Sequence, residues 1–475
     1  MAIDAPPRLP TLVSRPTGSS RARSHEVKFA RRSRLADLLV AACWTSAAAS
    51  VALFLGYGGA QQFATVAQAV TSIGILAGLV GTDLILVMIV LAARLPVIDR
   101  AVGNDRAMAL HRSLGKPALY LILGHALLLL VGYGMTSRLN PIAEIAPLWS
   151  IGDMPLAVLG LGLLIAVVIT SVVAVRRRFR YEFWHLVHLL SYIAVLVALP
   201  HELSVGGLLA SGTFQRGYWI ALYVIAFGGI GIYRFVIPVV RSVRHDVRIE
   251  RIERVSDDVV SIYLRGRDLT ALGSGGGQYF VWRFWSARTW WHSHPISLSA
   301  VPTETELRIT VRELGKGTAQ IARLRRGTRV WLEGPYGLFT DAGRTAPKLA
   351  VVAAGIGITP IRALLEHSRL APNEATILLR GTSESETYLL DELTAYAAER
   401  QAALYTSLGR RARGSRSWLS AHDAERGVSL RSTFPDLLKS DLYVCGPGVW
   451  AEQVVSEARA AGVPSHQIHF ERFDW

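Results

Sequence analysis

Six long apolar stretches, separated by short polar connections, occupy the first half of this chain. Most of them approach the roughly 20 residues that an α-helix needs to cross the hydrocarbon core of a bilayer. The stretches cover residues 35–57, 66–93, 117–133, 156–175, 183–199 and 218–240. The third and the fifth are short, but polar flanks can lie at the membrane interface. The sequence therefore predicts a six-helix transmembrane bundle within residues 35–240.

Composition narrows the remaining classes of protein. Hydrophobic residues make up 51% of the 475 residues and charged residues only 18%, which excludes disorder as the main state. Cys43 and Cys445 are the only cysteines, so a disulfide scaffold is excluded. The net charge of +15 is compatible with nucleic acid or with an anionic membrane surface. Residues 1–34 contain no apolar run, and we expect a disordered basic tail there rather than a signal peptide.

The positions of the basic residues distinguish between these partners. Seventeen of them lie in the tail and in the connections after the second and fourth stretches, whereas the other connections contain only Arg138 and Arg216. Basic residues favour the cytoplasmic ends of membrane helices. We therefore expect a multi-pass protein of the cell membrane, with the N-terminus and everything after residue 240 in the cytoplasm. The lipid bilayer is the expected partner, and no basic run requires nucleic acid.

Four histidines lie in the third and fifth stretches or at their ends. His111 and His125 are 14 residues apart, which on a helix is about 21 Å and within about 40° of a shared face. His188 and His201 are 13 residues apart, about 20 Å, but about 140° from a shared face, although Pro200 can distort that end. If both helices run outward together, His111 is level with His188. His125 is then level with His201, which predicts two stacked bis-histidine heme sites, whereas zinc needs tightly clustered ligands.

Two ionisable residues in these stretches leave alternatives open. His185 competes with His188 for the inner site, and its position nearer the interface favours a structural role. Asp83 lies in the middle of the second stretch, where a proton route and a locally satisfied buried acid are both open interpretations.

After residue 240 the apolar runs shorten and alternate with polar residues, which is typical of β-structure. From residue 346 onward, strand-like and helical segments alternate, which predicts a parallel sheet. We therefore expect a multi-domain chain in which the bundle is followed by an antiparallel β-barrel domain over 241–345 and an α/β domain over 346–475.

The chain resembles the ferric reductase and NADPH oxidase superfamily of transmembrane flavocytochromes b. The matching stretches are His111-Arg112-Ser113-Leu114-Gly115 with His125, and Tyr181-Glu182-Phe183-Trp184 leading to His188 and His201. The resemblance covers nearly everything from residue 35 onward. It implies that these four histidines are the axial ligands of two b-type hemes, and that the soluble half binds FAD and NADP as in ferredoxin reductases.

Three segments carry the expected FAD site. The stretch His294-Pro295-Ile296-Ser297-Leu298-Ser299 resembles the family's flavin-binding strand, where a hydroxyl faces the isoalloxazine edge. A hydroxyl suits flavin N5 because it can both donate and accept a hydrogen bond. Arg312 and the run Gly315-Lys316-Gly317-Thr318 form a predicted pyrophosphate cradle, since glycines admit close approach and Arg312 can pair bidentately. The terminal Trp475 resembles the aromatic residue that stacks on flavin in ferredoxin reductases.

Two glycine-containing turns carry the expected NADP site. Gly355-Ile356-Gly357-Ile358-Thr359-Pro360 follows a strand and begins a helix, which favours pyrophosphate binding, with Pro360 in place of a third glycine. The reductase family shares that departure, and it places the cysteine of Cys445-Gly446-Pro447-Gly448 beside nicotinamide. Arg380 and the pair Arg410-Arg411 lie where adenine-side groups are expected, and arginine there favours NADPH over NADH. A solvated basic loop is the alternative for residues 410–416.

These parts fit one chemical requirement. Nicotinamide gives up two electrons as hydride, heme iron accepts one at a time, and flavin converts between the two. We therefore expect a transmembrane NADPH-dependent oxidoreductase, with Ser297, Cys445 and Trp475 at the site of hydride transfer and a ferric chelate as the outer acceptor. An oxidase that reduces dioxygen to superoxide is the alternative. A redox partner or sensor subunit of a membrane complex is a third possibility, against which the complete flavin and nucleotide motifs argue.

Overall fold

The computed structural model describes residues 18–172, 181–204, 207–415 and 417–473, and it divides into two compact units. One unit comprises residues 35–237, and the other comprises residues 238–475 together with 1–34. Within the described residues, six helices are long and apolar enough to cross a membrane, as predicted. These spans are Ala30–Gly56, Val66–Ala92, Arg106–Ser137, Met154–Ser171, Phe183–Ser204 and Phe214–His245.

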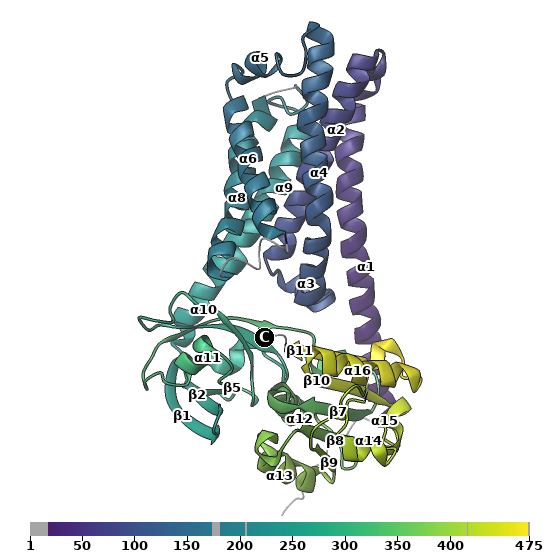
Figure 1. Ribbon diagram of the computed structural model, residues 1–475, viewed down its shortest axis with the longest axis vertical. Helices are drawn as coiled ribbons and strands as arrows, with labels where there is room; N and C mark the ends of the chain where they lie inside the picture. The colour runs from purple at the N-terminus through teal and green to yellow at the C-terminus, as the bar shows by residue number, and fades with distance from the viewer. Residues whose placement is uncertain (1–17, 173–180, 205–206, 416, 474–475) are drawn as a thin grey trace, which may run out of the picture. The chain divides into compact units, whose positions relative to one another are not determined.

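The bundle consists of long helices joined by short ones (Figure 1). The long helices are α1 (Gly18–Gly56), α2 (Val66–Ala92), α4 (Asn104–Ser137), α6 (Met154–Ser171), α8 (Tyr181–Ser204) and α9 (Phe214–Ile230). The short elements are η1 (Gly59–Phe63), α3 (Pro96–Ala101), α5 (Ile145–Trp149), the π-helical η2 (Gly231–Val236) and α10 (Ile237–His245). Helix α1 begins at Gly18, so the expectation of a disordered tail up to residue 34 is wrong for its second half. No proline or glycine follows Gly18 before residue 56, and nothing in that segment interrupts a helix.

Glycines on α2 allow α4 to approach closely. A Cβ atom added to Gly74 would lie 3.1 Å from the Leu128 side chain, and one added to Gly81 would lie 2.9 Å from Ile122. Between them, Gly78 faces the ring of His125. Small residues at such spacing let membrane helices pack backbone against backbone. This close packing brings His125 against α2.

The flavin-type domain contains two three-stranded antiparallel sheets, in the orders β1-β2-β5 and β4-β3-β6. The strands are β1 (Arg248–Ser256), β2 (Val259–Arg265), β3 (Tyr279–Phe284), β4 (His294–Ser297), β5 (Glu306–Arg312) and β6 (Val330–Tyr336), with helix α11 (Lys316–Ile321) after β5. One core that includes Ile262, Phe280 and Trp282 fills the space between the sheets. The two sheets are linked at both edges by isolated bridges, Leu298 with Ile309 and Arg248 with Arg329, so the predicted barrel consists of two separate sheets joined by bridges rather than one continuous ladder.

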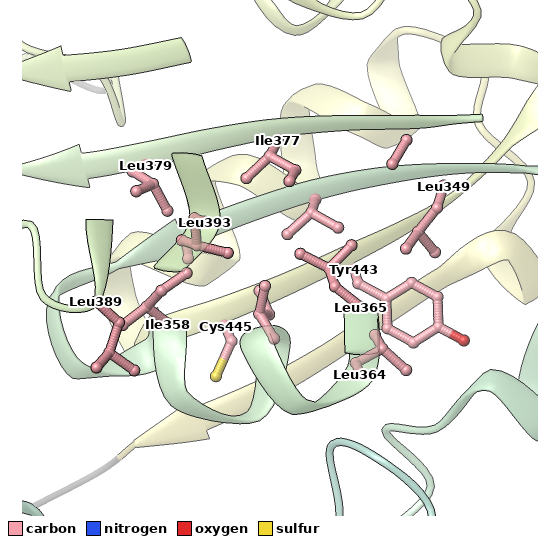
Figure 2. Packing of buried hydrophobic residues seen from close by; sticks show 14 of the residues in the cluster. Leu349, Ile358, Leu364, Leu365, Ile377, Leu379, Leu389, Leu393, Tyr443 and Cys445 are labelled. Carbon is pink, nitrogen blue, oxygen red and sulfur yellow. The ribbon is translucent and has the colours of Figure 1, made fainter. Parts of the chain in front are cut away.

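The nucleotide-type domain has a five-stranded sheet in the order β11-β10-β7-β8-β9, and every neighbouring pair is parallel. Its strands are β7 (Lys348–Ala354), β8 (Ala375–Gly381), β9 (Ala403–Leu408), β10 (Ser440–Pro447) and β11 (Ile468–Phe473). Its helices are α12 (Ile358–His367), α13 (Leu390–Arg400), α14 (Ala421–Glu425), α15 (Leu430–Thr433) and α16 (Gly448–Ala460). The predicted parallel α/β domain is confirmed. Figure 2 shows part of its core, where Leu349, Ile377 and Tyr443 of the sheet pack in one cluster with Leu364 and Leu365 of α12.

Candidate functional site

The structure brings His111 of α4 and His188 of α8 together. Their ring centroids are 6.1 Å apart, and the ring planes meet at 66°. The His111 Nδ1 lies 3.0 Å from the backbone carbonyl of Met88, and the His188 Nδ1 lies 3.5 Å from the Ser171 hydroxyl. In the tautomer that donates from Nδ1, the Nε2 of each ring is the nitrogen that can act as an acceptor or a metal ligand. His185 contacts Trp184, with 6.4 Å between the ring centroids, whereas Trp184 stacks on His188 at 5.3 Å.

The second pair consists of His125 on α4 and His201 near the end of α8. The His125 Nδ1 lies 2.9 Å from the carbonyl of Gly74, and the His201 Nδ1 bonds the carbonyl of Ala198. His201 also interacts electrostatically with His125. Pro200 lies inside α8 immediately before His201.

This donor pattern fits heme. A metal-bound imidazole almost always donates its other ring N–H to a carbonyl or similar acceptor, which fixes the tautomer and aims the free nitrogen at the metal. All four histidines have an oxygen within hydrogen-bonding distance of Nδ1, and three of those oxygens are backbone carbonyls. The residues present would therefore suit two hemes, one for each pair of histidines.

Two carboxylates also lie inside the bundle. Asp83 is fully buried and accepts a hydrogen bond from Ser46 at 2.5 Å, and Ser46 lies 3.1 Å from the Tyr218 hydroxyl. Its other carboxylate oxygen, Oδ2, is buried without a hydrogen-bond partner within the described residues, so Asp83 is satisfied at one oxygen only. Glu202, beside His201, accepts hydrogen bonds from Trp219 at 2.7 Å and from Tyr223 at 3.0 Å. Glu202 is not among the site residues expected from the sequence, where the signal for it is its position directly after His201, a predicted ligand.

Strand β4 presents unpartnered polar atoms. The Ser297 side chain is 3% exposed and its hydroxyl has no hydrogen-bond partner, and the Nε2 of His294 is likewise buried without one. A buried polar atom without a partner costs roughly 1–3 kcal/mol, so such atoms mark a place where a ligand completes the structure. Both atoms lie where the sequence predicts FAD, and they fit it. Ser299 differs, because its hydroxyl accepts from Thr310 at 2.8 Å inside the domain.

Helix α11 adjoins this strand. A Cβ atom added to Gly317 would lie 3.1 Å from the His294 ring, so the predicted pyrophosphate turn and the flavin strand are neighbours. The Thr318 hydroxyl accepts from the amide of Gly315 at 3.1 Å and stabilises the start of the helix. Arg312 pairs with Asp258 at 2.6 Å and with Glu386 at 3.4 Å. Its predicted bond to a phosphate would replace one of these carboxylates.

The electrostatics of β4 keep His294 neutral. Burial, together with the nearby positive charges of His292 and Arg283, lowers the pKa of His294 to about 4. A neutral imidazole can accept or donate at Nε2, depending on its tautomer.

The two nucleotide motifs meet because β7 and β10 are adjacent parallel strands, with Cys445 opposite Ala353. Gly355 has φ of +54°, and a side chain on Gly357 would collide with the Cys445 carbonyl, so both positions favour glycine. Pro360 lies in the first turn of α12, as predicted. The Thr359 hydroxyl donates to the carbonyl of Ile356 at 3.0 Å. Parallel strands that end together at helix N-termini form the edge at which such folds bind dinucleotides.

Cys445 lies in the apolar core rather than at the surface. Its thiol is fully buried close to Ile358, as Figure 2 shows. Burial raises the pKa of the Cys445 thiol, and the Glu471 carboxylate raises it further. The thiol is therefore protonated at neutral pH, and its contribution is a neutral surface rather than a nucleophile.

The three predicted adenine-side arginines separate into two groups. Arg380 is 6% exposed and donates to the carbonyls of Gly381, Ser407 and Gly409, so it stabilises the ends of β8 and β9. Arg410 is exposed, and Arg411 donates to Gln453 at 2.6 Å. These two remain the predicted ligands of a 2′-phosphate. Trp475 lies outside the described residues.

Comparison with known proteins supports both halves. The family described as ferric reductase like transmembrane component matches residues 77–199. Ferredoxin–NADP reductase B of Sorangium cellulosum is 34% identical over 177 residues, which cover 36% of this chain and 72% of that protein. A flavohemoprotein of Xylella fastidiosa is 29% identical over 206 residues, 42% of this chain and 50% of that protein. The chain thus spans about half the length of the curated flavohemoproteins it matches.

Among solved structures, the flavohemoglobin of Malassezia yamatoensis aligns with a TM-score of 0.42 and 18% identity, over 86% of this chain and 99% of that one. The FAD/NAD-binding domain of the nitric oxide dioxygenase from Vibrio cholerae aligns with a TM-score of 0.38 and 21% identity, over 48% of this chain and 99% of that one.

The fold and the site define a multi-pass membrane oxidoreductase that depends on NAD(P)H and binds FAD. The chain belongs to the ferric reductase and NADPH oxidase superfamily, in which a ferric-reductase-like transmembrane component is joined to a flavin- and nucleotide-binding part of the ferredoxin reductase type.

Proposed function

We propose that this protein transfers electrons from cytoplasmic NADPH across the cell membrane to an outer acceptor, as a ferric-chelate reductase with FAD and two b-type hemes as cofactors. The observation that carries the proposal is the placement of the four histidines on two helices, with His111 and His188 in ring contact and with an oxygen near the Nδ1 of every ring. The inner heme is held by His111 and His188, and the outer heme by His125 and His201. The bound groups supply one-electron carriers in the bundle and hydride chemistry at the flavin.

The residues of the soluble half bind and orient. Ser297 offers its unpartnered hydroxyl to the flavin edge, and His294 offers a neutral ring nitrogen beside α11. The turn at Gly355 and Gly357 admits the nucleotide pyrophosphate, and Arg410 and Arg411 favour the 2′-phosphate of NADPH. Cys445 would offer an uncharged, buried side chain next to a bound nicotinamide. Trp475 would supply the aromatic ring that the resemblance to ferredoxin reductases places on the flavin.

The presence of heme is tested by spectroscopy. The purified full-length protein is expected to show a reducible b-type absorbance with two hemes per chain. If dithionite produces no such absorbance, the heme assignment is wrong, while the flavin and nucleotide assignments stand on their own residues.

The acceptor distinguishes a ferric-chelate reductase from an oxidase. Purified protein in lipid, supplied with FAD and NADPH, is expected to reduce a ferric chelate faster than it forms superoxide in air. Faster superoxide formation would identify an oxidase. If NADPH is oxidised with neither acceptor, the chain is a redox partner or sensor subunit. The same assay with NADH in place of NADPH tests the nucleotide preference.

A further inference from the structure

Three exposed tryptophans gather on the connection between β3 and β4. Trp285, Trp290 and Trp291 are 43%, 52% and 45% exposed. Trp285 stacks with Trp290, with 6.4 Å between their ring centroids, and packs against Trp331 at 4.7 Å. Exposed large aromatic side chains that cluster on a soluble domain mark an interaction surface.

Exposed arginines lie on the same connection and on the connection before β6. The connection before β6 lies at the same end of the sheet, because Phe284 pairs with Val330 and the Trp285 amide donates to the Arg329 carbonyl at 2.9 Å. Within the described residues, four exposed arginines of the two connections have no carboxylate partner. These residues are Arg288, Arg323, Arg325 and Arg326. Together with Trp285, Trp290 and Trp291, they are called the Trp–Arg patch below.

Asp246, which pairs with Arg329 in the connection before β6, already has three arginine partners. It pairs with Arg248 at 3.1 Å, with Arg267 at 3.5 Å and with Arg329 at 3.6 Å. The patch therefore combines aromatic surface with uncompensated positive charge.

The chain enters the flavin-type domain at this same end. The sixth span ends at His245, and the carbonyl of Val247, two residues later, accepts from the Val330 amide at 2.8 Å. The Ile249 amide donates to the Thr328 carbonyl at 3.0 Å, so the arginine-bearing connection lies directly beside the first residues after the membrane span. A surface so close to a membrane anchor meets lipid headgroups at high effective concentration.

We propose that the Trp–Arg patch docks the flavin-type domain on anionic lipid headgroups. Tryptophan is enriched at membrane interfaces because its ring is apolar and its N–H is polar. Arginines next to a membrane span bind anionic headgroups electrostatically. The combination matches a lipid surface of negative charge, and this docking does not depend on which acceptor the bundle serves or on whether it holds heme.

The test uses the full-length protein in nanodiscs of phosphatidylcholine alone and of phosphatidylcholine with phosphatidylserine. Hydrogen exchange is measured by mass spectrometry in residues 285–293 and 323–329, with 424–428 of the nucleotide-type domain as the reference segment. The two patch segments are expected to exchange on the order of tenfold more slowly with phosphatidylserine, and high salt is expected to reverse this effect. The reference segment is expected to be unaffected.

Two charge-reversal variants sharpen the result. R288E/R325E/R326E is expected to lose the dependence on phosphatidylserine, whereas the matched variant R400E/R426E/R459E, with three exposed arginines of the other domain, retains it. Flavin reduction by NADPH confirms that both variants are folded.

The variant W290S/W291S tests the tryptophans. Its two patch segments are expected to lose their protection from hydrogen exchange in both lipid mixtures. Equal exchange in the two mixtures for the unmodified protein would overturn the proposal. Protection that persists in detergent would overturn it too, because a protein surface would then cover the patch.

Discussion

The rings of His111 and His188 face each other from neighbouring helices, with 6.1 Å between their centroids and 66° between their planes. A metal bound to two imidazoles, with bonds of about 2 Å as in zinc–imidazole sites, separates the ring centres by about 6 Å. The distance between the ring centroids of His111 and His188 would therefore suit a metal bound by both rings.

Substitution of His188 by alanine is expected to remove the inner heme and leave the outer one. The reason is that an alanine side chain offers no nitrogen to the metal, whereas His125 and His201 are unchanged. Heme content and the reduced-minus-oxidised spectrum of the purified variant measure the loss. His185→Ala is the matched control and is expected to keep both hemes, and loss of a heme in that variant instead would make His185 the ligand.

A methyl group at position 78 is expected to disturb the outer heme. The Cβ atom of Gly78→Ala would lie in contact with the His125 ring, and overpacking of this kind costs about 1–3 kcal/mol. The outer heme signal should weaken or shift in potential, while the inner one stays. Gly162→Ala on α6 is the control, since nothing lies within 4 Å of its added Cβ atom. An outer heme unchanged in Gly78→Ala would mean that His125 is not held in this position by α2.

Much of the fold could be predicted from the sequence because its signals are local. Apolar length predicted the six spans, and the alternation of strands and helices predicted the parallel sheet that unites Gly355 with Cys445. The start of α1 at Gly18 could not be predicted from residues 18–34, because a basic polar segment has the composition of a disordered tail. Such a segment can still be helical when it contains no proline.

Side-chain partners are less predictable because they depend on contacts between distant segments. Arg312 was expected to be free for a phosphate, yet it pairs with Asp258 and with Glu386, 74 residues away. Arg380 was expected to face adenine, yet it bonds the carbonyls of Ser407 and Gly409 from the neighbouring segment. Periodicity places a residue on an element, but it does not show which groups from other elements surround that residue.

Ser297→Ala is expected to slow flavin reduction by NADPH by roughly 10- to 100-fold, because the loss of a hydrogen bond to the cofactor is worth about 1–3 kcal/mol. Stopped-flow absorbance of the flavin measures the rate. The unfolding temperature should not fall, since the Ser297 hydroxyl has no partner in the protein. Ser299→Ala is expected to lower the unfolding temperature, because it removes the acceptor of the Thr310 hydroxyl. It should leave the rate of flavin reduction unchanged, because Ser297 is still present on the strand. Identical phenotypes for the two variants would refute the distinction.

Arg410→Ala and Arg411→Ala are expected to raise the KM for NADPH while leaving the KM for NADH nearly unchanged, because only NADPH carries the 2′-phosphate. Steady-state rates with each nucleotide check this. Arg380→Ala is expected to lower the unfolding temperature and to affect both nucleotides equally, since its guanidinium holds backbone carbonyls. A selective NADPH defect in Arg380→Ala would show that Arg380 reaches the nucleotide after all.

Acid should weaken the flavin-type domain through His294. Its pKa is about 4 in the folded protein, where burial and the charges of His292 and Arg283 disfavour the cation, against about 6.5 in an unfolded chain. Since the unfolded state binds the proton more readily, the stability supplied by the neutral ring is complete above pH 6.5 and declines as the pH falls toward 4. Release of flavin fluorescence on heating gives the unfolding temperature at pH 7.5 and at pH 5. The drop in this temperature between pH 7.5 and pH 5 should be smaller for His294→Asn than for the unmodified protein. His422→Gln, at an exposed site in the nucleotide-type domain, should behave like the unmodified protein. An equal difference for all three proteins would assign the acid sensitivity to other groups.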